Sequence, residues 1–110
     1  EQVLKDTHRR MYEIIREKHS DIPYLIISKP DFVYRSEDAS RRRSVILDTY
    51  TYAVNNGDKN VYFIDGSSMF RGRDWDNCFI DTVHPNDLGF VKMADCMEPI
   101  ITSALELITV

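Results

Sequence analysis

The chain has 110 residues, 43% of them hydrophobic and 29% charged, which is typical of one globular domain. Its formal net charge of −4 argues against nucleic acid as a main partner, because proteins that bind nucleic acids usually present a basic surface. No apolar run approaches the about 20 residues that a membrane-spanning helix needs, so we expect no membrane span. The basic run at 41–43 is a local exception, and we interpret it as the solvated start of a helix.

The first half of the chain predicts a helix, a strand and a second helix. Residues 3–18 place apolar side chains along one stripe, and Pro23 prevents the helix from continuing. Residues 24–28, "YLIIS", form a short apolar run after a turn, which is typical of a strand buried on both faces. Residues 37–55 have a second apolar helical stripe, and Gly57 in the turn "NNGDKN" is a suitable stop.

The second half predicts a strand, a long loop and a final helix. Residues 61–65, "VYFID", predict a second buried strand. Residues 66–86 follow as a loop of about 20 residues, and loops of this length often carry function. The last helix is expected to begin near Asp87 and to be kinked or broken at Pro99.

This alternation of helices and strands predicts an α/β fold in which helices pack on a parallel sheet. Two parallel strands with three helices make a poor sheet, because each strand needs neighbours and cover on both faces. We therefore expect that strands of the complete fold lie outside this chain.

The stretch "FIDTVHPNDLGF", residues 79–90, carries the most informative chemistry. Asp81 lies three positions before His84, and a carboxylate on Nδ1–H of an imidazole orients the ring as a general base. Pro85 fixes one backbone torsion directly after the histidine, and Asn86 or Asp87 can cap the following helix. In open α/β sheets, ligands bind beyond the carboxyl ends of the strands, where this loop would lie.

At "DTVHPNDLGFVKMAD", residues 81–95, the chain resembles the closing block of the SGNH hydrolases, the GDSL-type esterases and acylhydrolases. "IPYLIISKP" and "GDKNVYFIDG" are similar to two strands of that family. The resemblance covers most of the chain and implies a flavodoxin-like three-layer α/β/α fold, of which residues 1–110 are the C-terminal part of a single domain. It also implies ester hydrolysis without a cofactor, with Asp81 and His84 as acid and base of a Ser-His-Asp triad.

The family's nucleophile motif, similar to G-D-S, and its oxyanion block G-x-N-D are both absent from this sequence. Of the nearby serines, Ser67 and Ser68 are better explained as turn residues. We therefore expect nucleophile and oxyanion donors to come from a missing N-terminal half or another chain, and this chain alone to be a poor catalyst. The resemblance implies an ester substrate, acyl or acetylated carbohydrate, and Trp75 and Phe79 beside Asp81 are candidates for contacting it.

Two alternatives remain open at this stage. Asp81, His84 and Asp87 offer mixed nitrogen and oxygen ligands, but a metal site would normally draw ligands from elsewhere, and we predict none. His8 and His19 are expected on a helix surface. The second alternative is a non-catalytic, flavodoxin-like binding module that completes its sheet with another chain, and its open sheet edge would favour self-association.

The cysteines and the start of the chain leave the compartment open. Cys78 and Cys96 do not form a disulfide framework, and the sequence does not decide whether they are bonded. No signal peptide is visible, but the chain begins with Glu1 rather than Met, so a secreted or periplasmic location stays compatible with it.

Overall fold

The computed structural model describes residues 2–30, 36–70, 77–80 and 84–109. Helices and strands alternate as the sequence predicts. In chain order the elements are α1 (Gln2–Lys18), β1 (Tyr24–Ile27), α2 (Ser36–Asn55), β2 (Val61–Ile64), the short 3-10 helix η1 (Gly66–Ser68) and α3 (Asp87–Thr109).

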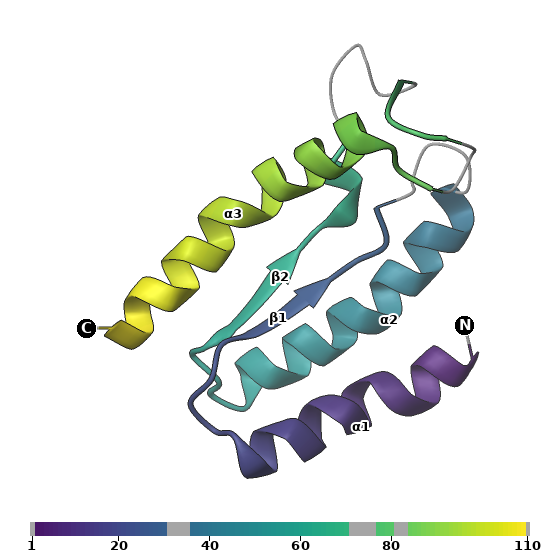
Figure 1. Cartoon of the computed structure of the whole chain (residues 1–110). Coiled ribbons are helices and arrows are strands. Elements are labelled where there is room, and N and C mark those ends of the chain that lie inside the picture. Colours follow the sequence, from purple (N-terminus) through teal and green to yellow (C-terminus); the bar gives the residue numbers. More distant parts are fainter. Residues whose placement is uncertain (1, 31–35, 71–76, 81–83, 110) are drawn as a thin grey trace.

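The two strands pair in parallel, with Tyr24 opposite Val61 and Ile27 opposite Ile64. Helices α1 and α2 lie on one side of this sheet and α3 lies on the other (Figure 1). The arrangement confirms the predicted α/β class, with the three layers of an incomplete flavodoxin-like fold.

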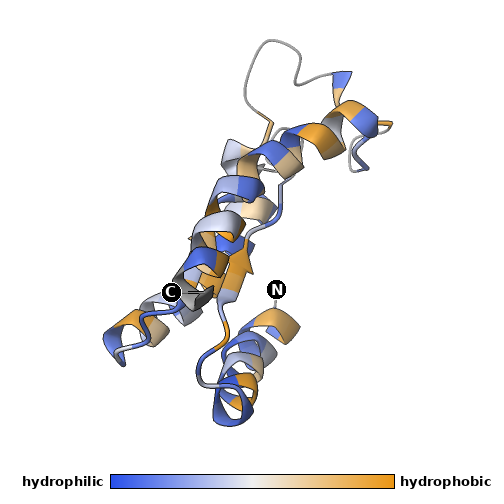
Figure 2. Ribbon diagram, turned by 60° about the vertical axis from the view of Figure 1, so that its left-hand side comes forward, coloured by the Kyte–Doolittle hydropathy of each residue, from blue (hydrophilic) through white to orange (hydrophobic). Residues whose placement is uncertain are grey.

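Each face of the sheet has its own hydrophobic core. Ile26 of β1 belongs to the core under α1 and α2, whereas Leu25 packs against the core under α3. Neighbouring residues of one strand therefore enter different cores, which explains why β1 is a continuous apolar run rather than an alternating one. Figure 2 shows the strands as hydrophobic segments between helices that carry many hydrophilic residues.

The outer edge of β1 is open. The backbone N–H of Ser28 donates to the carbonyl of Ile64 at 3.0 Å, so this residue and every second residue before it face β2. The N–H and C=O groups of Leu25 and Ile27 consequently point to the opposite side, where no strand pairs within the described part of the chain. Ile27 is also 43% exposed.

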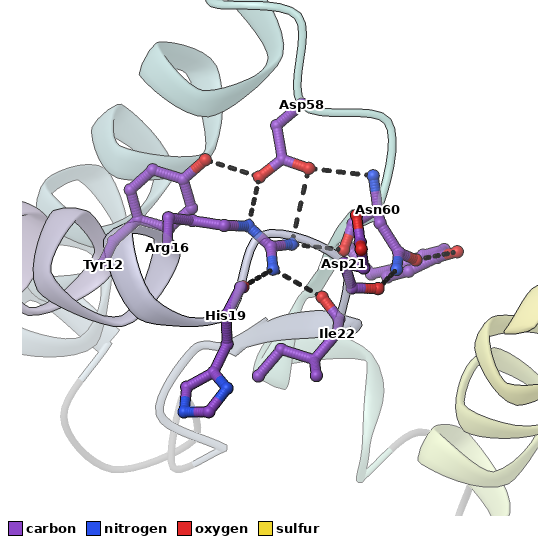
Figure 3. Close-up of polar contacts among 8 residues, drawn as sticks. Tyr12, Arg16, His19, Asp21, Ile22, Asp58 and Asn60 are labelled. Carbon is purple, nitrogen blue, oxygen red and sulfur yellow. Dashed lines mark hydrogen bonds and ion pairs between the residues drawn. The ribbon is translucent and has the colours of Figure 1, made fainter.

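A buried ion pair fixes the amino-terminal end of the sheet (Figure 3). Arg16 Nε lies 2.8 Å from Asp58 Oδ2, and the two side chains are only 12% and 11% exposed. The Tyr12 hydroxyl donates to the same carboxylate at 2.5 Å. The guanidinium also donates to the main-chain carbonyls of His19, Ile22 and Asn60. This network joins the end of α1 to the turn between α2 and β2.

Two local expectations can be compared with the structure. Helix α3 is continuous through Pro99, so of the kink or break expected there the break does not occur. Pro99 and Asp95, whose carbonyl would otherwise accept the missing hydrogen bond, are both exposed, so water can hydrate that carbonyl. His8 is half-buried rather than on the open surface, because Nδ1 contacts the Thr49 hydroxyl at 2.8 Å, and burial lowers its pKa.

The predicted stop of α2 is confirmed at Gly57, whose φ of +86° lies in the left-handed region that favours glycine. Across the residues that the structure describes, none of the helices combines the length and apolar character needed to cross a membrane.

Candidate functional site

The described residues on either side of 81–83 pair with each other just before α3. Phe79 and Pro85 face each other in an antiparallel bridge. The N–H of Ile80 donates to the carbonyl of His84 at 2.8 Å, and the N–H of Asn86 donates to the carbonyl of Cys78 at 2.7 Å. These two hydrogen bonds hold residues 78–80 alongside residues 84–86, and the two short segments together form an antiparallel ribbon.

His84 lies at the end of this ribbon that is farther from α3, opposite Ile80. Opposed residues of an antiparallel pair project to the same face, so the side chains of His84 and Ile80 share one face, and Phe79 and Pro85 share the other. His84 is exposed, and Ile80 is 78% exposed. An imidazole in this position is accessible to an incoming hydroxyl group.

Asp81, the predicted partner of His84, lies outside the described residues. It directly follows Ile80 in the sequence, and the N–H of Ile80 donates to the carbonyl of His84. A carboxylate-to-imidazole contact between Asp81 and His84 stays a prediction.

Helix α3 begins at the end of the ribbon and is capped by Asn86. Asn86 Oδ1 accepts a hydrogen bond from the N–H of Gly89 at 3.0 Å, which is the geometry of an N-cap. Of the two predicted caps, the structure therefore uses Asn86. Gly89 leaves room for the ribbon beside the first turn of α3, because a Cβ there would lie 2.4 Å from the carbonyl oxygen of Cys78.

A second polar cluster follows the carboxyl ends of both strands. Ser28 is 1% exposed, and its hydroxyl accepts a hydrogen bond from the N–H of Gly66 at 2.5 Å. A Cβ on Gly66 would lie 2.3 Å from the carbonyl oxygen of Lys29, so the chain after β2 passes tightly against the end of β1. The chain that leaves β2 is therefore held against the carboxyl end of β1.

Asp65 links this cluster to α2. Arg43 Nη1 lies 3.0 Å from Asp65 Oδ2. The basic run at 41–43 was expected to be solvated, and this ion pair shows that it is not wholly so. Partial burial raises the pKa of Asp65, but hydrogen bonds from Ser67 and the charge of Arg43 outweigh it and lower the pKa below its ordinary value. The sequence carries a signal for this cluster that our sequence analysis did not use, namely polar residues directly after both apolar runs.

The serines near the strand ends build the turn rather than point to a free nucleophile. Ser67 contacts Asp65 through its N–H, at 3.0 Å, and through its hydroxyl. Ser68 Oγ donates to the carbonyl of Asp65 at 2.6 Å and lies 3.3 Å from Cys96 Sγ. These contacts agree with the turn role that the sequence suggests for both residues.

Of the two predicted substrate-contacting residues, the structure describes only Phe79. Trp75 lies outside the described residues. Phe79 is partly buried, with its ring centroid 4.8 Å from that of Phe70, in the core under α3. The contact with Phe70 shows that Phe79 packs in the core, and any contact of Phe79 with substrate stays a prediction.

Cys78 and Cys96 are not joined by a disulfide bond, and Cys78 is buried. Among the described residues, no group of three His, Cys, Asp or Glu side chains is arranged to hold a metal ion. Asp81, one member of the alternative metal set, is not among the residues searched.

The position of the ribbon agrees with the general rule for ligand sites in open α/β sheets. Both strands run toward the end of the molecule where residues 77–80, residues 84–86 and the start of α3 lie (Figure 1). Ligands of such sheets bind beyond the carboxyl ends of the strands. Fold and location together define a parallel α/β protein with an exposed histidine beyond the carboxyl ends of its strands.

Comparison with known proteins identifies the family. The model of the GDSL-like lipase/acylhydrolase family matches residues 1–102, so the chain belongs to this family. Among solved structures, the chain is similar to the salicylyl-acyltransferase SsfX3 from a tetracycline biosynthetic pathway, with a TM-score of 0.67 and 19% sequence identity. The match covers 91% of this chain but 32% of the acyltransferase chain. A search of curated proteins finds no match.

Proposed function

We propose that this chain supplies the base and acid of a serine esterase or acylhydrolase, with His84 as base and Asp81 as acid. The nucleophilic serine and the oxyanion donors come from polypeptide outside residues 1–110. Family membership supports an acyl-transfer reaction, and the exposed imidazole on a hydrogen-bonded ribbon is the observation that carries the assignment of His84.

In this mechanism, Nε2 of His84 accepts the proton of the serine hydroxyl as its oxygen attacks the ester carbonyl. The carboxylate of Asp81 holds Nδ1–H and stabilises the imidazolium that forms. The proton then passes to the departing alcohol, which leaves an acyl-enzyme. Attack by water gives hydrolysis, and attack by a second alcohol gives acyl transfer, the reaction named for the structurally similar acyltransferase.

The place of the missing part follows from the handedness of the chain. Strand-to-strand crossovers between parallel strands are right-handed in nearly all proteins. Helices α1 and α2 lie on the same face, and the crossover through α2 leads from β1 to β2. A parallel strand joined to β1 through α1 would therefore lie on the open side of β1, beside Leu25 and Ile27.

The same open edge favours one second candidate, a non-catalytic module that completes its sheet by pairing with another chain. Such a module would associate through β1 and would need neither Asp81 nor His84 for binding. Sedimentation of the purified chain over a range of concentrations tests the association, and a charged substitution at Ile27 should weaken it.

Enzyme assays on the longer gene product, or on this chain combined with the missing half, test the catalytic proposal. With a chromogenic short-chain ester, His84→Ala should reduce kcat by about a thousandfold or more, and Asp81→Asn should reduce it less. His19→Ala is the matched control, because His19 is exposed at the far end of α1 and should leave turnover unchanged. Full turnover in His84→Ala would refute the assigned role.

The isolated chain provides an additional check. It should hydrolyse the ester little or not at all, because base and acid have no nucleophile and no oxyanion donors to act with. Activity of the isolated chain that is lost on substitution of Ser67 or Ser68 would place the nucleophile inside the chain and contradict the proposal.

A further inference from the structure

We propose that Asn86 is a positioning residue that fixes the direction of the His84 side chain, a role that rests on the proposed function of His84. The side-chain amide of Asn86 forms hydrogen bonds on both sides. Nδ2 donates to the carbonyl of Asn77 at 2.5 Å, and Oδ1 accepts from the N–H of Gly89 at 3.0 Å. One planar group therefore joins the first strand of the ribbon to the first turn of α3.

The main chain of Asn86 takes part in the same junction. Its N–H donates to the carbonyl of Cys78 at 2.7 Å, and its carbonyl accepts from the N–H of Phe90 at 2.9 Å. All four polar groups of the residue are thus hydrogen-bonded. They connect residues 77–78, the strand that carries His84 and the first turn of α3 into one unit.

The choice of asparagine needs this double role. Serine, threonine or aspartate would cap a helix about as well as asparagine does. None of them presents a donor and an acceptor on opposite sides of one planar group, as an amide does. A carbonyl can only accept, and an N–H can only donate, so the two partners also determine the orientation of the amide.

Packing reinforces the hydrogen bonds. A Cβ at Gly89 would lie 2.4 Å from the carbonyl oxygen of Cys78 and 2.8 Å from Cβ of Pro85, so the first turn of α3 lies directly against the ribbon. The carbonyl of His84, in the peptide bond to Pro85, accepts a hydrogen bond from the N–H of Ile80. The main chain that follows His84 is therefore held by residues 78–80 and by the first turn of α3, which restricts the direction in which the imidazole leaves the chain.

The variant Asn86→Asp separates positioning from helix capping. A carboxylate keeps the oxygen that accepts from Gly89 and suits a helix N-terminus, but it cannot donate to the carbonyl of Asn77. Asn86→Ala removes both contacts. Asp87→Asn is a control at the adjacent exposed residue, with a change of the same two side-chain types in the opposite direction.

Measurements on the 110-residue chain need no turnover, so they give a result even if the catalytic proposal fails. In Asn86→Asp, loss of one hydrogen bond should speed amide exchange at Ile80 by about tenfold, with exchange in the interior of α3 unchanged. The ring resonances of His84 should shift, while those of His19 stay in place. Asn86→Ala should add a loss of helical stability.

Two results would overturn the proposal. Unchanged Ile80 exchange and unchanged His84 resonances in Asn86→Asp would show that the amide does not position the loop. Faster exchange that is equally large in the interior of α3 would make Asn86 a helix cap alone. In an active complete protein, Asn86→Asp should lower kcat with little change in KM, whereas a failure of His84→Ala to reduce turnover bears only on the catalytic proposal.

Discussion

Replacement of Asp58 by alanine should destabilise the fold strongly without touching the candidate site. The carboxylate accepts hydrogen bonds from the Tyr12 hydroxyl at 2.5 Å, Arg16 Nε at 2.8 Å and the N–H of Asn60 at 2.9 Å. The alanine variant leaves the guanidinium of Arg16, which is only 12% exposed, without its counter-charge. Removal of one partner from a buried ion pair typically costs about 3–5 kcal/mol.

The lower end of that range applies here. The guanidinium keeps three main-chain carbonyl acceptors in the variant, so its charge is not left wholly unsolvated. A loss of about 3 kcal/mol in a chain of this length corresponds to a fall in Tm of about 12 °C. Thermal and urea unfolding followed by circular dichroism measure both quantities. Asp48→Ala, at an exposed position of α2, should change the free energy of unfolding by less than about 0.5 kcal/mol.

A double variant distinguishes the ion pair from simple loss of contacts. If the cost arises from the uncompensated charge, Asp58→Ala combined with Arg16→Leu should be less destabilised than the sum of the single variants. Additive effects in this cycle, or a fall in Tm of less than about 2 °C in Asp58→Ala, would refute the reasoning.

The same residue predicts the response to acid. Burial raises the pKa of Asp58, but hydrogen bonds from Arg16 and Tyr12 outweigh it, so the folded-state pKa lies below the ordinary value. Its stabilising contribution is therefore present above the unfolded-state pKa of about 3.9 and is lost as the pH falls through the lower folded-state pKa. The difference in stability between the wild type and Asp58→Ala should accordingly shrink below about pH 4.

Stability at alkaline pH and the tolerance of two glycines to substitution can also be predicted. Burial, together with its hydrogen bond to Asp58, raises the pKa of Tyr12 to about 12, so its contribution is present below about pH 10 and is lost as the pH rises toward 12. Tyr12→Phe should remove this alkaline loss, as measured by unfolding between pH 8 and 12, and a wild-type stability that does not change over this range would contradict the assignment. Gly66→Ala should cost about 1–3 kcal/mol, because its Cβ meets two backbone carbonyls at 2.3 and 2.4 Å. A Cβ at Gly57 would meet nothing within 4 Å, so Gly57→Ala should cost about 1 kcal/mol through the φ of +86° alone. Gly57→Asn should cost less than Gly57→Ala, because asparagine adopts this conformation more readily. Equal costs of the alanine substitutions at Gly57 and Gly66 would contradict this account.

The regular elements could be predicted from the sequence because their signals are local. The predicted strand at 24–28 and the observed strand Tyr24–Ile27 differ by one residue, and the predicted helix at 37–55 differs from Ser36–Asn55 by one. Apolar runs, helical stripes and turn residues act within a few positions of the chain, so each boundary is encoded where it occurs.

The contacts that determine the ends of the sheet could not be predicted in this way. Arg16 and Asp58 are 42 positions apart, and Arg43 and Asp65 are 22 apart. Charged residues on helices are usually solvated, and no periodicity states which of them meet across the fold. The half-buried position of His8 was missed for the same reason, because it depends on the approach of α2 at Thr49.

The candidate site falls between these two cases. The D-x-x-H-P-N spacing predicts a capped turn, and the ribbon with its Asn86 cap confirms that much from local sequence. The second hydrogen bond of Asn86 depends on where residue 77 returns to the helix, after a loop whose path the sequence does not encode locally. Asparagine was therefore recognised as a cap, but its link to Asn77 emerged from the structure.

The two ends of the sheet should behave as independent units in mutagenesis. Strands of four residues at about 3.3 Å per residue separate the Asp58 network from the Asn86 junction by about 10 Å or more. Substitutions at that distance without shared partners usually have additive effects on stability. Asp58→Ala should therefore lower Tm without changing the rate of amide exchange at Ile80 relative to that in the interior of α3. The double variant Asp58→Ala, Asn86→Asp should lose the sum of the stabilities lost by the two single variants. A clear excess over that sum would mean that the ion pair at the amino-terminal end also supports the loop that carries His84.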